Sequence, residues 1–199
     1  MKFITALDYE HLDNGMFLTA FARALSQKKE RGIILHGDSE YTNRIIQTGV
    51  MREDATIRAT KELSRRLVAL LADEGVPVIA LNGYQKSLVT ITNDRITIDK
   101  SQIENLPGET IILISNLVTY QERSFQSLSL SDLSEAFLTT FQIEELTLFS
   151  IKDGADIMSA EYPKIVGLSD SYNEGVKQQI PKEFRSADYR IRLTTPSVF

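Results

Sequence analysis

Polar or small residues follow four of the apolar runs that the sequence predicts as buried strands. They are Asp8 and Tyr9, then His36 to Ser39, then Ser115 and Asn116, and finally Lys152 to Asp156. The carboxyl ends of parallel strands meet at one edge of a sheet, where ligands of α/β proteins bind. We therefore expect any ligand site to be built from these four groups. The turn after the first run contains no glycine, so it is not a glycine-rich phosphate loop.

Several kinds of catalysis are excluded by the residue types alone. The chain has no cysteine, which excludes disulfides, thiolate nucleophiles and sulfur-rich zinc sites. Its two histidines, His11 and His36, are too few for a multi-histidine metal site, and neither lies in the sequence context of a serine nucleophile. His36 at a strand end is most simply a partly buried histidine that forms hydrogen bonds. We predict no metal ligands.

The spacing of apolar residues predicts strands that alternate with helices. Strands are expected at 2–7, 33–35, 77–81, 110–114 and 146–151, and helices from residue 12 to about 31, at 54–74, and from residue 132. This alternation indicates an α/β fold, a three-layer αβα sandwich with a mostly parallel sheet. Two further strand-like runs at 87–98 flank Asn93 and Asp94, which predicts a β-hairpin inserted beside the main sheet.

Some boundaries are predicted from capping residues and turn formers. Asp13 is expected to cap the first long helix, and Asp132 with Glu135 has the spacing of an N-cap and its reciprocal partner. Tyr189 to Leu193 alternates like an edge strand, and Pro196 is predicted to end the ordered chain.

Charge and hydropathy exclude two classes of partner. The chain has 22 basic and 27 acidic residues in 199, a net charge of −5, which disfavours binding along nucleic acid. No stretch approaches the roughly 20 apolar residues that span a bilayer, and the start of the sequence does not resemble a signal peptide. We expect a cytoplasmic protein without a membrane or nucleic-acid partner.

The ordered set of motifs resembles the amino-acid kinase family, and within it acetylglutamate kinase most of all. The resemblance runs from Lys2 to about Met158. Its parts are the strand Ile33 to Gly37, the segment Gly49 to Arg52 before the long helix, the strand ending Leu81-Asn82-Gly83, the stretch Ser129 to Asp132, and the strand Leu148 to Gly154. The resemblance implies an amino-acid-kinase-like domain at 1–158, with 159–199 as a truncated remnant of the nucleotide-binding half.

The resemblance also implies roles for single residues. Gly37, Arg52 and Asn82 would bind the substrate, with Arg52 holding the carboxylate of an acyl amino acid. Asp132 would be catalytic by orienting a lysine, and Asp153 and Gly154 would face the nucleotide. A plainer reading remains for each of them. Arg52 is typical of a solvated or capping residue, Asp132 of a helix cap, and Gly37 and Asp153-Gly154 of turns.

The sequence departs from the family where phosphates would be held. Phosphoryl transfer depends on positioning and on neutralising the charge of the transferred group. In the family the first strand ends in a lysine and paired glycines, whereas Thr5, Ala6, Leu7 and Asp8 stand here. Asp38 and Ser39 replace a second glycine run, and Ile151 replaces the first nucleotide-side aspartate.

Three functions are compatible with this pattern. The first is a degenerate acetylglutamate-kinase-like domain, catalytically impaired, that acts as a small-molecule-binding or regulatory module, with a small acidic metabolite as ligand and a homodimer or a related kinase as partner. The second is an active compact kinase that phosphorylates an acyl amino acid with ATP and Mg²⁺, with Lys2 or a later lysine supplying the missing cation. The third is a structural subunit without a ligand.

Overall fold

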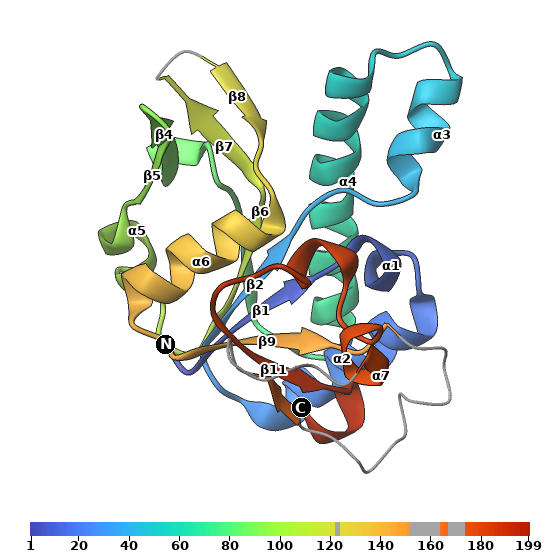
Figure 1. The fold of residues 1–199 in the computed structure, drawn as a ribbon, viewed down its shortest axis with the longest axis vertical. Helices are drawn as coiled ribbons and strands as arrows, with labels where there is room; N and C mark the ends of the chain where they lie inside the picture. Colours follow the sequence, from blue (N-terminus) through green and yellow to red (C-terminus); the bar gives the residue numbers. More distant parts are fainter. Residues whose placement is uncertain (122–123, 152–163, 167–173) are drawn as a thin grey trace.

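The computed structural model describes residues 1–121, 124–151, 164–166 and 174–199. A seven-stranded sheet with the order β10-β11-β9-β1-β2-β6-β3 forms the centre (Figure 1). All neighbouring strands in it are parallel except β10 and β11. Its strands are β1 (Phe3–Leu7), β2 (Gly32–His36), β3 (Val78–Asn82), β6 (Ile111–Ser115), β9 (Glu145–Phe149), β10 (Lys164–Val166) and β11 (Arg190–Thr194).

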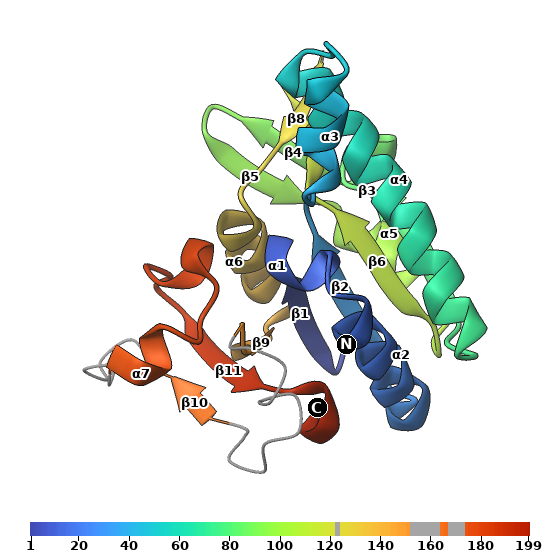
Figure 2. The same ribbon diagram turned by 90° about the vertical axis from the view of Figure 1, so that its right-hand side faces the viewer.

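Helices cover both faces of this sheet. The helices are α1 (Tyr9–Leu12), α2 (Gly15–Lys28), α3 (Tyr41–Gln47), α4 (Arg52–Asp73), α5 (Lys100–Glu104), α6 (Leu130–Phe141) and α7 (Glu174–Lys177). Helices α2 and α4 lie on one face and α6 on the other (Figure 2). The predicted three-layer αβα sandwich with a mostly parallel sheet is confirmed.

Two apolar clusters fill the space between the layers, because successive residues of a strand point to opposite faces. In β2, Ile34 packs with α2 and α4, while Ile33 and Leu35 pack on the side of α6. In β1, Phe3 and Leu7 belong to the first cluster and Ile4 and Ala6 to the second. Both faces are buried, so strands β1, β2 and β6 are apolar runs without polar alternation.

A second sheet of four strands, in the order β5-β4-β7-β8, stands beside the main sheet on the side of α6. Its strands are β4 (Val89–Thr92), β5 (Arg95–Ile98), β7 (Leu117–Tyr120) and β8 (Ser124–Ser127). The predicted β4–β5 hairpin is confirmed, and Asn93 and Asp94 both have the positive φ that its turn needs. The β7–β8 hairpin was not predicted, since both strands are only four residues long and β8 is largely polar.

Two predicted helix caps are wrong by a few residues. Helix α2 is capped by Asn14, not Asp13, because the Asn14 side chain accepts the hydrogen bond from the Phe17 N–H. Helix α6 begins before Asp132, since Ser129 is its N-cap and accepts the hydrogen bond from the Asp132 N–H. Asp132 therefore lies in the first turn of α6.

The predictions for the last thirty residues are only partly right. Strand β11 is not an edge strand, because it pairs with β9 on one side and β10 on the other. Order also continues past Pro196, which begins a short 3₁₀ helix. The ring of Phe199 packs against Phe3 and Phe149 at centroid distances of 5.2 and 5.3 Å.

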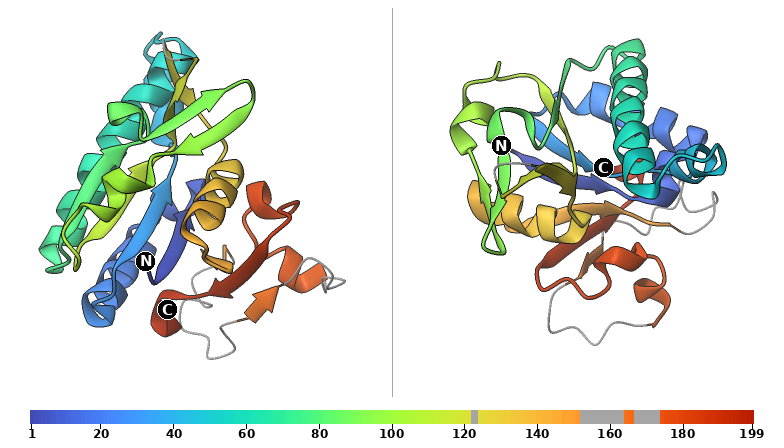
Figure 3. Two further views of the ribbon diagram at one scale, coloured as in Figure 1. Left: turned by 90° about the vertical axis from the view of Figure 1, so that its left-hand side faces the viewer. Right: turned by 90° about the horizontal axis from the view of Figure 1, so that it is seen from above.

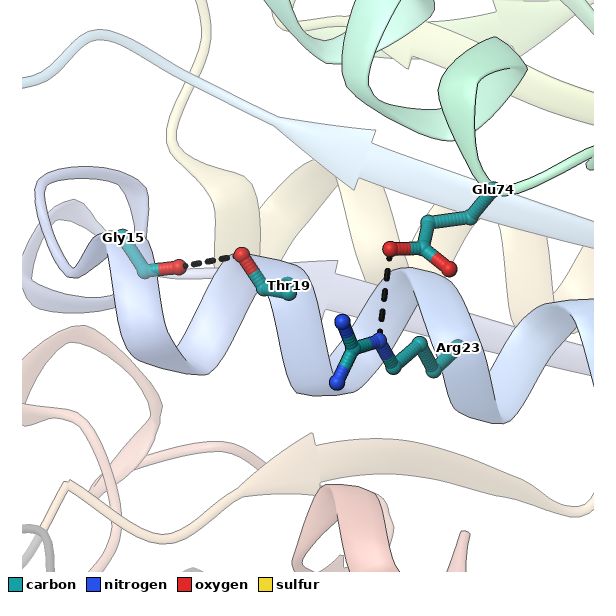
Figure 4. A network of polar contacts seen from close by, with 4 residues as sticks. All are labelled: Gly15, Thr19, Arg23 and Glu74. Carbon is teal, nitrogen blue, oxygen red and sulfur yellow. Dashed lines mark hydrogen bonds and ion pairs between the residues drawn. The ribbon is translucent and has the colours of Figure 1, made fainter.

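Polar contacts join helices α2 and α4 at the surface (Figure 4). Arg23 Nε of α2 donates to Glu74 Oε1, just after α4, at 3.3 Å, and Thr19 Oγ1 donates to Gly15 O within α2 at 2.9 Å. An exposed ion pair of this kind adds less than about 1 kcal/mol to the free energy of unfolding. Among the described residues, no helix has both the length and the apolar content needed to cross a membrane.

Candidate functional site

The carboxyl ends of four parallel strands form a row of residues at one edge of the main sheet. Leu7 pairs with His36, His36 with Ser115, and Ser115 with Asn82. The turns that follow these strands carry Asp8, Gly37 and Asn116. The structure thus brings together three of the four predicted groups; the fourth, at 152–156 and including Asp153 and Gly154, lies outside the described residues.

Hydrogen bonds between neutral groups connect the ends of β2, β6 and β3. Ser115 Oγ donates to Asn82 Oδ1 at 2.9 Å. The Asn116 N–H donates to His36 O at 2.8 Å, and its Nδ2 donates to Leu128 O at 2.7 Å. We call His36, Gly37, Asn82, Ser115 and Asn116 the hydrogen-bonded half of the site.

His36 is a structural member of this half. Its side chain is fully buried, with Nδ1 2.9 Å from Gly37 O and Nε2 2.8 Å from Ser64 Oγ of α4. Burial lowers the pKa of His36 to about 4, so the ring is neutral at pH 7. The neutral ring then donates from Nδ1 and accepts the Ser64 hydroxyl at Nε2. These contacts confirm the prediction that His36 forms hydrogen bonds, but the ring is fully buried and not partly buried as predicted.

Gly37 and Asn116 approach each other closely. A Cβ atom at position 37 would lie 3.2 Å from Asn116 Nδ2, so a larger residue there would displace the amide. Asn116 Oδ1 is buried and has no hydrogen-bond partner in the described part of the chain. A buried acceptor without a donor is unfavourable unless a ligand or water supplies one. This atom is therefore the best candidate in this half for contact with a ligand.

The start of helix α6 is held by residues far along the chain. Glu183 Oε1, from the 3₁₀ turn Lys182–Phe184, accepts a hydrogen bond from the Leu130 N–H at 2.5 Å. The Tyr189 hydroxyl lies 3.1 Å from Ser131 Oγ and 3.2 Å from Ser131 O. Amides at a helix N-terminus are the groups that bind phosphate in many proteins. Here a carboxylate of the chain itself takes one of them.

Three carboxylates gather at this end of the site, and we call Asp8, Asp132 and Glu183 the carboxylate half. Burial raises the pKa of Asp8, against the opposing effect of hydrogen bonds from the Tyr9 and Glu10 amides. Glu183 is exposed as a residue, but its carboxylate lies against α6. Partial burial there raises its pKa, and the negative charges of Asp8 and Asp132 raise it further.

The described residues do not fit the phosphates of ATP. The end of β1 carries the buried side chains of Leu7 and Asp8 where a phosphate would need close backbone. Glu183 occupies the Leu130 amide, and the local charge is negative. The described residues also hold no group of three or more His, Cys, Asp or Glu side chains arranged to bind a metal ion. The described residues of this edge therefore do not support a reaction step that uses ATP or Mg²⁺.

Arg52 lies apart from the other predicted substrate-binding residues. It is the first residue of α4 and is exposed, whereas Ser64 of the same helix touches His36. Twelve residues of α-helix separate them, about 18 Å. The structure thus places Gly37 and Asn82 at the carboxyl ends of β2 and β3, and Arg52 at the N-terminal end of α4. A role for Arg52 in substrate binding stays a prediction.

Sequence reasoning missed the two residues that hold α6. Glu183 and Tyr189 lie more than fifty positions from their partners, and a lone glutamate after Pro181 has no motif that would mark it. Asn116, in contrast, was among the residues that the sequence predicted for the site, because it follows a central strand.

Comparisons with known proteins identify the fold. The crystal structure of smu.665 from Streptococcus mutans matches with a TM-score of 0.62 and 16% identity, over 75% of this chain and 73% of that one. Isopentenyl phosphate kinase from T. acidophilum matches with a TM-score of 0.61 and 11% identity, over 98% and 92%. N-acetylglutamate synthase from Neisseria gonorrhoeae matches with 0.63 and 13%, over 98% of this chain but 54% of that one.

No family model matches the sequence, and no curated protein does. At these identities the likeness shows the fold and not the activity. The chain therefore has the αβα fold of the amino-acid kinases.

Proposed function

We propose that this chain is a degenerate amino-acid-kinase-like module that binds a small polar metabolite or a protein partner and does not transfer phosphate efficiently. One observation carries the proposal: the Glu183 carboxylate accepts the Leu130 N–H at the start of α6, beside Asp8 and Asp132. Transfer of a phosphoryl group needs cations and free amides at the place where charge develops. Carboxylates there repel the substrate.

The hydrogen-bonded half is the part of the site that we propose for ligand binding. It combines the close backbone of Gly37 with the buried, unpaired Oδ1 of Asn116. Oδ1 is an acceptor, so a ligand with an amide or hydroxyl donor would satisfy it. N-acetylglutamate has such an amide as well as carboxylates, so it is the first small acidic metabolite to test. Pairing with a second copy or with a related kinase is part of the same proposal.

An active compact kinase is the alternative, and it needs a cation near Asp132. Lys2 does not supply it from its present position, because it precedes β1 while the candidate site follows that strand. Six residues of extended chain separate Lys2 from Asp8, about 20 Å. Two described lysines lie closer to this edge: Lys182, next to Glu183, and Lys61 of α4, which lines a hollow together with Ser64 and Asn82.

Turnover of ATP separates the two functions. The purified chain is incubated with ATP, Mg²⁺ and N-acetylglutamate, and ADP release is measured beside that of the Asp132→Ala and Arg52→Ala variants. We expect no difference between the three proteins. Turnover at an ordinary enzymatic rate, about 1 to 1,000 per second, that is lost in both variants would overturn the proposal.

Ligand binding is tested separately by thermal shift. A ligand that binds only the folded chain raises its melting temperature. We expect a shift with N-acetylglutamate or a related amide, absent in Asn116→Ala, and none with ATP. A chain that responds to ATP alone, or to no metabolite and no partner, would contradict the binding role.

A further inference from the structure

Helix α6 has a hollow along each of its two flanks. The first, about 920 Å³, lies between α6 and the second sheet. The second, about 430 Å³, lies between α6 and the residues that lead into β11. Glu135 and Thr139 line both hollows, so the two meet across the exposed side of α6. The left view of Figure 3 shows α6 between the β4–β5 hairpin and the segment before β11. We call this continuous surface the α6 groove.

Apolar side chains that are only half covered form the floor of the larger hollow, and the polar side chains of Thr97, Gln126, Thr139 and Thr140 also line it. Ile96 and Ile98 of β5, Tyr120 of β7, Leu128 and Ala136 line it, and all five are partly buried. Four of them also pack against the apolar core, which holds them in place. A row of partly exposed apolar side chains in a hollow is a feature of protein-binding surfaces.

The rim of the groove is acidic. In the larger hollow Asp94, Asp132 and Glu135 stand against one cation, Arg95. The smaller hollow adds Glu144 and Asp188 and has no basic residue in its lining. Of these carboxylates, Glu144 is paired with Arg190 at 3.8 Å. The groove thus presents an apolar floor between negative walls.

We propose that the α6 groove is the docking surface for a basic amphipathic helix of another protein. Apolar side chains of that helix would fill the trough between α6 and β5, and its lysines or arginines would face Glu135, Asp132 and Asp94. The twelve residues of α6 form a wall of about 18 Å, long enough for three turns of a partner helix. Complementary charge would increase the rate and the specificity of docking.

The shape of the surface favours a polypeptide over a small molecule. A small ligand is usually enclosed on most sides by its pocket, which has a volume of about 300–1,000 Å³. The larger hollow, about 920 Å³, is within this range, but it lies open to solvent and continues over the ridge of α6 into the second hollow, so it would not enclose such a ligand.

A second copy of this chain fits the groove less well. Its exposed arginines on α4, Arg58, Arg65 and Arg66, provide positive charge. Of the large exposed apolar residues of the described chain, Phe125 lies beside this face, with its ring 5.0 Å from Lys61 Nζ. One exposed ring is less than the row of apolar side chains that the floor of the groove would accept.

Binding of a designed peptide tests this proposal. The probe is a labelled peptide of about 14 residues with leucine at helical spacing and lysine elsewhere, and its affinity for the full chain is measured by fluorescence anisotropy. We expect saturable binding that the Glu135→Lys variant weakens about tenfold, since the substitution reverses a charge at the ridge of the groove. Ala136→Leu, which keeps the charge and reduces the trough, should also weaken it.

Matched controls separate the groove from general attraction to an acidic protein. Glu62→Lys makes the same change of charge on α4, across the sheet, and should alter the affinity less than twofold. A serine–lysine peptide, a leucine–glutamate peptide and spermine should bind at least about tenfold more weakly than the probe.

Several results would overturn the proposal. They are equal binding to Glu135→Lys and the parent chain, equal binding of the serine–lysine peptide or spermine, and no saturable binding. A change of oligomeric state in Glu135→Lys, seen by size-exclusion chromatography with light scattering, would show that a second copy occupies the groove instead. None of these outcomes depends on whether the chain transfers phosphate.

Discussion

The two halves of the candidate site lie on the same sheet edge and differ in charge. The hydrogen-bonded half joins β2, β6 and β3 through neutral amides, hydroxyls and the His36 ring. The carboxylate half, next to it, gathers Asp8, Asp132 and Glu183 around the start of α6. The first half satisfies most of its polar atoms internally, while in the second half burial and then the negative charges of Asp8 and Asp132 raise the pKa of Glu183.

This difference shows that one sheet can carry neutral and charged groups at the same edge. Strand pairing and the apolar clusters position the residues of both halves, whatever the charge of their side chains. Activity depends on side chains at the edge and not on the sheet beneath them. The two halves should therefore respond differently to acid and to substitution.

The largest expected effect is a loss of stability when the pH is lowered. Burial lowers the pKa of both His36 and His11 to about 4, from an ordinary value of 6.5. Below pH 6.5 the unfolded chain takes up protons that the folded chain refuses, so the free energy of unfolding falls until about pH 4. The loss is on the order of 3 kcal/mol for each histidine.

Two acids of the carboxylate half change the free energy of unfolding in the opposite direction as the pH falls. Asp8 and Glu183 have raised pKa values, so the folded chain binds their protons more readily and gains stability as the pH falls through these values. We expect the destabilising effect of the two histidines to exceed the stabilising effect of the two acids, because the pKa values of the histidines are shifted further. Urea unfolding at a series of pH values from 7.5 to 4 measures the balance. A free energy that stays constant or rises toward pH 4.5 would contradict the buried, neutral histidines.

The second prediction concerns the hydrogen-bonded half directly. His36→Ala leaves a cavity, and it leaves the Ser64 hydroxyl without its partner. We expect a loss of about 2–4 kcal/mol in the free energy of unfolding at pH 7.5. Ser64→Ala removes the same hydrogen bond without a large cavity and should cost about 1 kcal/mol. Equal effects of the two variants would mean that the ring contributes little beyond that bond.

The sequence predicted the hydrogen-bonded half better than the carboxylate half. Strands β2 and β6 are continuous apolar runs, and their ends are marked by His36-Gly37 and Ser115-Asn116, so local pattern was enough to bring these residues together. Asn82 was identified through the family resemblance, and it lies in the same row. The detailed contacts, such as that between Asn116 and Leu128, depend on a hairpin that the sequence pattern did not show.

The carboxylate half could not be predicted because it is assembled over long distances. Leu130 meets Glu183 across 53 positions, and no periodic pattern connects them. The N-cap of α6 was predicted three residues too late, at Asp132, because Asp132 and Glu135 have the spacing of a capping pair. The N-cap in the structure is Ser129. The altered charge at Asp8 was nevertheless visible in the sequence, as a carboxylate in place of glycine.

A third prediction tests the carboxylate that holds α6. Glu183→Ala leaves the Leu130 N–H without its acceptor and should cost about 1 kcal/mol, the usual effect of losing a helix cap. Glu183→Gln keeps an oxygen acceptor and removes the charge that Asp8 and Asp132 repel. It should therefore be at least as stable as the parent at pH 8. Lys182→Ala, the neighbouring exposed substitution, is the control and should change little.

Acid should reduce the advantage of Glu183→Gln over the parent. As the pH falls, Glu183 becomes protonated in the parent, and the two proteins then carry the same charge at this position. Thermal unfolding at pH 8 and pH 5 measures the difference. An advantage that grows toward pH 5 would mean that Glu183 is stabilised as a carboxylate and that the three acids do not repel one another.

The smallest expected effect lies outside both halves, at the contact of α2 with the end of α4 (Figure 4). Arg23→Ala removes an exposed ion pair with Glu74 at 3.3 Å, which should lower the free energy of unfolding by about 0.5 kcal/mol or less. The loss should disappear in about 1 M salt, because exposed charges are screened there. The pH dependence assigned to the histidines and to Glu183 should be unchanged in this variant, since neither half contacts Arg23. A changed pH profile would mean that the acid response reports general loosening of the helices and not the charges of the site.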